Sequence, residues 1–260
     1  MNILTEPAVT VLSRQVFLGH PDIDWESDSM VGGEALAEFA GRLCYLSFGE
    51  DAGVSGGHKS IPGRTTNAQY MSNILKVKHG SVLEHATWSL LLEGISRSLT
   101  HELVRHRAGF AYSQLSQRYV DESEVGFVLP PEILEDTEAY DVWLGSCERV
   151  LDEYQTLLGF IEAQVEHIES RTLRRKRARE TARSVLPNCA ETKIVVTGNA
   201  RAWRHLMELR GSPSADQEIR RLSFAIHEKL VAEAPAIFGD LRRATTDDGT
   251  DYLTTENPKV

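Results

Sequence analysis

Helical periodicity dominates the second half of the chain and limits the folds that it can adopt. Beyond Pro130 and Pro131, apolar side chains recur at steps of three and four residues, which predicts one long amphipathic helix. These side chains are Trp143, Cys147, Val150, Tyr154, Leu157, Ile161, Val165 and Ile168. Such a face packs in a core or against another subunit. Strand-like runs are few and do not alternate regularly with the helices, so the pattern favours the α+β class over a doubly wound sheet.

Shorter segments predict the remaining elements. Further helices are expected at 33–46, 66–78, 96–107, 173–185, 200–209 and 216–231. Buried strands are expected at 86–93 and 193–197. The segments 47–65 and 108–119 are interpreted as loops, and the polar tail 245–260 is expected to be loose. No segment is typical of a linker, so we predict a single domain over residues 1–260.

The charge and the cysteine content argue against several classes of protein. The 260 residues carry 28 basic and 38 acidic side chains, and this net charge of −10 argues against a nucleic-acid partner. Neither a long apolar run nor a basic leader is found, so we expect a cytoplasmic protein without a membrane partner. Cys44, Cys147 and Cys189 are far apart and odd in number, which predicts buried thiols rather than a disulfide framework or a cysteine zinc site.

Histidine, glutamate and arginine are concentrated between His79 and Tyr119. His101 and His106 resemble the pair of a zinc-protease helix, but a spacing of five residues places them roughly 140° apart around the axis, so they cannot share one metal. We therefore expect no metal site. The sequence has no Gly-x-Ser-x-Gly turn and no Gly-rich phosphate or dinucleotide loop. Covalent catalysis and the common nucleotide-binding folds are therefore disfavoured.

The chain does contain guanidinium groups beside hydroxyl and amide groups. Arginine forks with serine and glutamine donors bind phosphate and the polar edges of a base or a flavin. The set comprises Arg105, Arg107, Ser113, Gln114, Ser116, Gln117 and Arg118, and later Arg183, Asn199, Arg201, His205 and Arg210. A separate basic cluster is either a solvated helix face or a local contact for an anion. It consists of Arg174, Arg175, Lys176, Arg177, Arg179 and Arg183.

Four segments, in order along the chain, carry a family resemblance. The first three are GRLCY at 41–45, HGSVLEH at 79–85, and Arg105-His106-Arg107 followed by Ser116-Gln117-Arg118-Tyr119. The fourth is ARSVLP at 182–187 with GNARAWRHLMELR at 198–210. Together they resemble the flavin-dependent thymidylate synthases, the ThyX family. The resemblance implies a ThyX-like α+β fold with mixed helices around a small antiparallel sheet, assembled as a homotetramer.

The resemblance also implies an activity. FAD would be bound noncovalently and reduced by NADPH, 5,10-methylenetetrahydrofolate would supply a one-carbon unit, and C5 of a uridine nucleotide would be methylated. The expected substrate is dUMP, converted to dTMP, and UMP is the alternative. The family uses no cysteine to attack the base, which agrees with the missing nucleophile. The principal rival hypothesis is a catalytically silent relative that binds nucleotides or nucleic acid through the basic cluster.

Roles for individual residues follow from the same resemblance. The flavin contacts would be Ser81, Glu84, Arg105, His106, Arg107, Gln114, Asn199, Ala200, Arg201 and His205. The nucleotide contacts would be Glu102, Arg105, Gln114, Leu115, Ser116, Gln117, Arg118, Arg183 and Arg210. Arg210 would be catalytic, because a fixed cation beside the uracil N3 stabilises its ionised form and enriches C5 in electron density.

Two departures from the family pattern affect this assignment. Eight residues, rather than the commoner seven, separate Arg107 from Ser116, so the first half of this segment is expected to bulge. Glu102 stands where many relatives have Gln. Its carboxylate either accepts hydrogen bonds from the sugar hydroxyls, which would favour UMP, or forms an ion pair with Arg105 or Arg118.

Overall fold

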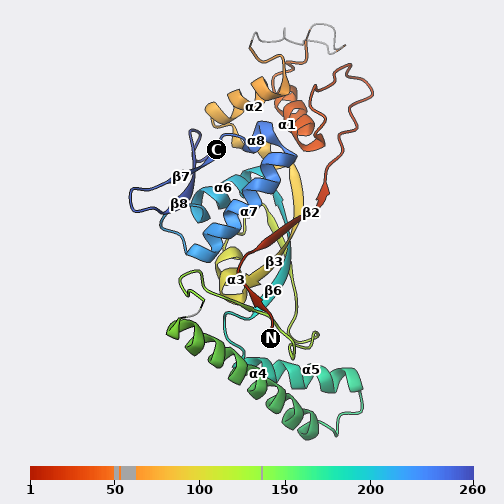
Figure 1. Ribbon diagram of the computed structural model, residues 1–260. Coiled ribbons are helices and arrows are strands. Elements are labelled where there is room, and N and C mark those ends of the chain that lie inside the picture. The colour runs from red at the N-terminus through yellow and green to blue at the C-terminus, as the bar shows by residue number, and fades with distance from the viewer. Residues whose placement is uncertain (50–52, 54–62, 136) are drawn as a thin grey trace. The chain divides into compact units, whose positions relative to one another are not determined.

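The computed structural model describes residues 1–49, 53, 63–135 and 137–260, and Figure 1 labels its elements. Contacts between Cα atoms divide the chain into two compact units. Unit 1 comprises Met1–Ala8, Leu92–Arg105 and Ser113–Ile194, and unit 2 comprises Val9–Leu91, His106–Tyr112 and Val195–Val260. Each unit is built from separate stretches of sequence, so folding must bring its site residues together. Most of the loop predicted at 47–65 lies outside the described residues.

Two neighbouring helices dominate unit 1 (Figure 1). α4 (Glu138–Gln164) confirms the predicted long helix, and the Thr137 hydroxyl caps it by accepting from the Tyr140 N–H at 3.3 Å. α5 (Arg171–Ala182) packs against α4 and continues as the 3-10 turn η2 (Arg183–Val185). The unit also contains α3 (Arg97–Leu103) and the parallel pair β1 (Ile3–Leu4) and β5 (Phe127–Val128). Although α4 is long, no helix of the described residues is apolar enough over a sufficient length to span a membrane.

Helices enclose the core of unit 2. They are α1 (Gly32–Leu43), α2 (Asn67–Lys76), the 3-10 helix η1 (Gly80–His85), α6 (Ala200–Arg210), α7 (Gln217–Glu233) and α8 (Pro235–Phe238). The helices predicted at 33–46, 66–78, 200–209 and 216–231 are thereby confirmed, with ends shifted by a few residues. Trp88 packs edge-on against Phe238, with 5.6 Å between the ring centroids, and both side chains are buried. Large aromatic surfaces therefore anchor this core.

A four-stranded sheet has the strand order β2-β3-β6-β4. Its strands are β2 (Ala8–Arg14), β3 (Thr87–Ser96), β6 (Glu191–Asn199) and β4 (Phe110–Gln114). β3 and β6 confirm the predicted strands and are longer than expected. Thr192, Ile194 and Val196 of β6 are buried, as the period of two requires, so a polar hydroxyl stands at an inward position. Helices and strands together form the mixed α+β fold that the sequence predicts.

The structure contradicts two loop predictions. Within 108–119, Phe110–Gln114 form β4, because Phe110 and Tyr112 alternate along the strand and Phe110 packs edge-on against Trp203 at 4.8 Å. In the tail, β7 (Leu241–Thr245) and β8 (Asp251–Thr255) form an antiparallel hairpin. Gly249 adopts φ +86° in the connecting turn, and Leu253 is buried. An Asp-Gly turn and one apolar anchor thus order a polar segment.

Two further expectations need correction. The helix predicted at 96–107 is α3, which ends at Leu103 because Leu103 is its last buried side chain and Val104 is already exposed. The cysteines were expected to be buried, but Cys44 is exposed and Cys189 is half-buried, so the prediction is correct for Cys147 alone.

Candidate active site

Unit 2 contains most of the residues predicted to contact a flavin. Ser81 and Glu84 lie on η1, which contacts α6. Asn199 is the N-cap of α6, and Ala200, Arg201 and His205 lie on that helix. His106 and Arg107 come from the short stretch that unit 2 takes from the middle of the chain. Two distant segments therefore lie along α6.

One hydrogen bond joins the signature segment to the end of α6. Arg210 Nε donates to His106 Nε2 at 2.9 Å, so this ring nitrogen is the acceptor. The Tyr112 hydroxyl donates to the His106 carbonyl at 2.5 Å. Burial raises the pKa of Tyr112 to about 12, so this donor keeps its proton. The His205 ring lies edge-on to His106, with 6.1 Å between centroids. The Arg210 guanidinium is therefore held in one orientation.

The N-terminus of α6 is fixed by backbone contacts. Asn199 Oδ1 accepts from the Ala202 N–H at 2.8 Å, and the Asn199 N–H donates to the Gly109 carbonyl at 3.1 Å. Gly109 has φ +76°, and a Cβ at this position would lie 2.7 Å from Asn199 Nδ2, so glycine is required. The Ala200 methyl is buried, and its N–H donates to the Ala86 carbonyl at 2.8 Å. Asn199 and Arg201, rather than Ala200, therefore present polar side-chain atoms here.

Arg201 and Glu84 form an ion pair between α6 and η1. Arg201 Nη1 lies 2.6 Å from Glu84 Oε1, and the two side chains are 45% and 48% exposed. Arg201 Nε also donates to the Val260 carbonyl at 3.3 Å. Because an exposed pair of this kind contributes little stability, its charges can reorganise around a ligand at low cost.

Unit 1 contains the remaining predicted residues. Glu102 lies on α3 and Gln114 ends β4, and Leu115, Ser116, Gln117 and Arg118 follow β4, while Arg183 lies at the start of η2. Arg105 Nη1 lies 2.6 Å from Glu102 Oε1, which is one of the two ion pairs that the sequence allowed. Arg118 Nη2 pairs instead with Glu180 Oε2 at 3.0 Å. Arg118 Nε is buried and has no hydrogen-bond partner among the described residues.

Three residues around Gln114 were not predicted from the sequence. Gln114 Nε2 donates to Thr100 Oγ1 at 3.1 Å and to Thr192 Oγ1 at 3.3 Å. Arg97 Nη1 donates to Thr192 Oγ1 at 3.0 Å and to the Leu115 carbonyl at 3.1 Å. A hydroxyl at an inward strand position, such as Thr192, is the sequence signal that could have found them.

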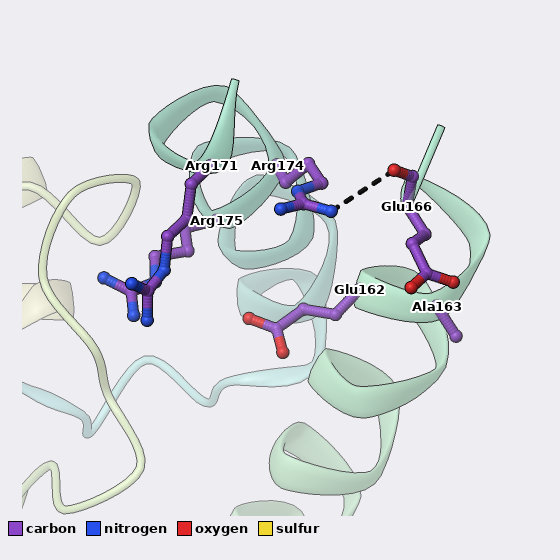
Figure 2. Close-up of a pocket in the computed structure, with 6 residues that line it drawn as sticks. All are labelled: Glu162, Ala163, Glu166, Arg171, Arg174 and Arg175. Atoms are coloured by element: carbon purple, nitrogen blue, oxygen red, sulfur yellow. Dashed lines mark hydrogen bonds between the residues drawn. The ribbon is translucent and has the colours of Figure 1, made fainter. Parts of the chain in front are cut away.

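Half of the basic cluster has partners within unit 1: Arg174, Lys176 and Arg179. Arg179 donates to the Tyr119 carbonyl at 2.6 Å and to Asp121 Oδ2 at 3.1 Å, and Lys176 lies over the Tyr119 ring. A nearby cavity has a volume of about 420 Å³. Figure 2 shows that both acidic and basic side chains line it. It is lined by Glu162, Ala163, Glu166, Arg171, Arg174 and Arg175. The carboxylates offset part of the positive charge, so this surface is mixed rather than purely basic.

The cysteines form no activated nucleophile in the described part of unit 1. Cys147 Sγ lies 3.9 Å from Cys189 Sγ, and burial raises the pKa of Cys147 to about 12. The thiol therefore stays protonated at neutral pH. Among the described residues, no group of three or more His, Cys, Asp or Glu side chains is placed to hold a metal ion.

Comparison with known proteins covers both units. The family model "Thymidylate synthase complementing protein" matches residues 27–236. A flavin-dependent thymidylate synthase of Mycobacterium sp. (strain JLS) is 49% identical over 251 residues, which cover 95% of this chain and 94% of the relative. The corresponding protein of Mycobacterium avium (strain 104) is 47% identical over 246 residues, with the same coverage.

A solved structure supports the fold. The UMP/dUMP methylase PolB from Streptomyces cacaoi, bound with 5-Br dUMP, aligns with a TM-score of 0.64 at 19% identity, over 92% of this chain and 96% of that chain. The family model and the sequence matches define a flavin-dependent enzyme of nucleotide biosynthesis. The chain belongs to the family of flavin-dependent thymidylate synthases, which methylate dUMP to dTMP, as the sequence resemblance predicts.

Proposed function

We propose that this enzyme uses FAD, NADPH and 5,10-methylenetetrahydrofolate to methylate C5 of dUMP. Most of the proposed flavin contacts belong to unit 2, and most of the proposed nucleotide contacts belong to unit 1. One observation carries the assignment of roles. It is the hydrogen bond from Arg210 Nε to His106 Nε2, because it fixes a cation against the signature segment. A guanidinium held in this way is preorganised to stabilise negative charge on a bound base.

The donor groups of unit 2 fit a flavin dinucleotide. Its diphosphate needs cationic donors, and the exposed Arg201 guanidinium is one of them. The polar edge of the isoalloxazine needs amide, hydroxyl and imidazole groups, which Asn199, Ser81 and His205 supply. Arg107 adds a second exposed cation. FAD, when bound and reduced, supplies the hydride that completes the methyl group.

The nucleotide would be held mainly by unit 1. Arg118 offers its partnerless Nε to the phosphate, and Arg183 adds a half-buried cation. Ser116 and Gln117 supply a hydroxyl and an amide beside them. Arg210 would bind the uracil and favour loss of its N3 proton, because a fixed positive charge stabilises the anion that forms. The extra electron density at C5 makes this carbon a better nucleophile, so no enzyme thiolate is required.

UMP is a second candidate substrate. PolB, which shares the fold, is described as a methylase of both UMP and dUMP. The Glu102 carboxylate, which pairs with Arg105 here, would be able to accept hydrogen bonds from both ribose hydroxyls. The matches to thymidylate synthases at 49% identity favour dUMP as the principal substrate.

We also propose that the enzyme is a homotetramer and that residues 1–260 form one catalytic domain. The family match runs through both units, which supports a single domain. Large apolar side chains are exposed at Val16, Leu18 and Met30 in unit 2 and at Phe160 in unit 1, as expected for surfaces that other subunits cover. Sedimentation equilibrium of the purified protein tests this proposal, and a monomer at micromolar concentration would contradict it.

The purified protein should be yellow, with the absorption band of oxidised flavin. Anaerobic NADPH should bleach this band, and dUMP should bind with at least the affinity of UMP. A colourless protein that neither takes up FAD nor binds dUMP would contradict the proposal and favour a catalytically silent relative. Binding of nucleic acid at physiological salt would point to the same alternative.

A further inference from the structure

A closed hydrogen-bond network surrounds the Gln114 side chain in unit 1. The Thr100 hydroxyl donates to the Arg97 carbonyl at 2.8 Å, and the Arg97 guanidinium donates to Thr192 Oγ1 at 3.0 Å. Gln114 Nε2 closes the network by donating to both hydroxyl oxygens, at 3.1 Å and 3.3 Å. Arg97 takes part twice, because its backbone carbonyl accepts from Thr100 and its guanidinium donates to Thr192. The Gln114 amide therefore bonds to two threonines that Arg97 links to each other.

The network determines which way the Gln114 amide faces. A hydroxyl has one proton, and Thr100 gives its proton to the Arg97 carbonyl. Thr100 Oγ1 can therefore only accept from Gln114, so the amide group facing it must be the NH₂ group. Both Nε2 protons are then used, one by Thr100 and one by Thr192. Gln114 is exposed, and the only polar side-chain atom that it can still use to bind a ligand is the acceptor Oε1.

The threonines are suited to a fixed orientation. Thr100 is 4% exposed and Thr192 is 1% exposed, so water does not compete for either hydroxyl. Thr192 Oγ1 has two lone pairs and receives two donors, Arg97 and Gln114. Arg97 also donates to the Leu115 carbonyl, while the Leu115 N–H donates to the Lys193 carbonyl at 2.9 Å. The main chain beside Gln114 is thus fixed along with its side chain.

We propose that Arg97, Thr100 and Thr192 are positioning residues that present Gln114 Oε1 as a hydrogen-bond acceptor toward the bound ligand. Gln114 Oε1 makes no hydrogen bond within the described part of the chain. It would select a ligand that offers an N–H or O–H donor, such as a sugar hydroxyl of the nucleotide or an imide N–H of uracil or flavin. This inference rests on the proposed function, in which Gln114 contacts the ligands.

Double-mutant cycles test whether the threonines act through Gln114. Thr100→Val and Thr192→Val remove only the hydroxyl groups, and each should weaken binding of one ligand by about three- to tenfold, the worth of one hydrogen bond. In a Gln114→Ala background, neither valine substitution should weaken binding further. Two titrations distinguish the ligands: dUMP added to the FAD-loaded enzyme, and FAD added to enzyme stripped of flavin.

A matched control separates positioning from general damage. Thr181→Val removes a hydroxyl that donates to the Arg177 carbonyl on an exposed face of α5, at 3.2 Å, and it should leave both affinities unchanged. Equal losses in the wild-type and Gln114→Ala backgrounds would overturn the inference, because the threonines would then act independently of Gln114. Unchanged affinities in both valine variants would overturn it as well. Wild-type protein that binds neither dUMP nor FAD would contradict the proposed function itself and the inference with it.

Discussion

Two pairs of site residues are joined by side-chain bonds in unit 2, whereas two site residues of unit 1 depend on partners outside the predicted site. In unit 2, Arg210 bonds to His106 and Arg201 pairs with Glu84. In unit 1, Gln114 depends on two threonines and Arg118 pairs with Glu180, none of which the sequence resemblance includes. The family signature therefore includes both partners of these unit 2 bonds, but it does not include the residues that support Gln114 and Arg118 in unit 1.

The two regions also differ in how their charges are supported. On α6, the helix that also carries Arg201, the side chain of Arg204 is completely buried. It pairs with Asp240 through two hydrogen bonds of 2.5 and 2.9 Å. The Arg118–Glu180 pair of unit 1 is more than one-third exposed on both sides. A buried pair is costly to break, whereas an exposed pair contributes little. We therefore expect the Arg204–Asp240 pair of unit 2 to be rigid before ligands bind, whereas the exposed pairs Arg118–Glu180 and Arg201–Glu84 can adjust to them.

The largest expected effect comes from breaking the buried pair. Asp240→Asn leaves the buried Arg204 without a counter-charge and should lower the free energy of unfolding by about 3 kcal/mol. Glu180→Gln, the matched change in unit 1, should lower it by less than about 1 kcal/mol. Urea denaturation of the two variants measures both values. Equal losses of unfolding free energy in the two variants would contradict the expected difference between the buried pair and the exposed pair.

The same pair predicts a pH dependence. Burial alone would raise the pKa of Asp240, but the hydrogen bonds and charge of Arg204 lower it below its usual value. A carboxyl with a lowered folded-state pKa contributes stability at neutral pH, and this contribution is lost as the pH falls through that pKa. The wild-type protein should therefore lose more stability between pH 7 and pH 3 than Asp240→Asn does. Thermal melts of both proteins at pH 7 and pH 3 measure these losses. Equal losses of stability in the wild type and in Asp240→Asn would contradict the prediction.

The next largest effect concerns catalysis. Arg210→Ala should retain FAD but lose methylation by about a hundredfold, because a cation that stabilises charge developing on the base contributes roughly 3 kcal/mol. Arg210→Lys should also be impaired, since an ammonium does not reproduce the planar fork that bonds to His106. Turnover of both variants is measured beside their flavin absorbance. Undiminished turnover would remove Arg210 from the mechanism.

A smaller effect is expected at Glu102. Because its carboxylate pairs with the exposed Arg105, Glu102→Gln should lower turnover of UMP and dUMP alike, by less than about fivefold. The ratio of the two rates should stay within about threefold of the wild-type ratio. A marked shift toward dUMP would instead show that this carboxylate binds the second sugar hydroxyl.

The smallest effect is expected from the cysteines. A Cys44→Ser, Cys147→Ser, Cys189→Ser triple variant should keep its activity per folded molecule within about twofold, since the flavin route needs no thiolate. It should melt at a lower temperature than the wild type, because Cys147 lies in an apolar cluster with Val125, Phe127 and Ala190. A covalent adduct between one of these sulfurs and a 5-halogenated nucleotide would contradict this prediction.

Periodicity predicted elements whose apolar faces are buried, and it failed where long-range contacts decide. α4, α6 and α7 were predicted because their apolar residues recur at helical spacing. β4 was predicted to be a loop because its strand pattern is two aromatic residues long, and Trp203, far along the chain, stabilises it. Thr192 carries no catalytic motif, and its role depends on contacts with Arg97 and Gln114 that only the fold creates.

The central claim is that a flavin and not a thiolate drives methylation at C5 of the nucleotide. Release of tritium from [5-³H]dUMP measures this reaction directly, with [5-³H]UMP assayed in parallel. We predict release that requires FAD, NADPH and 5,10-methylenetetrahydrofolate together, that is faster with dUMP than with UMP, and that persists in the triple serine variant. Tritium release that proceeds equally well without flavin, or none with the complete mixture, would contradict the account.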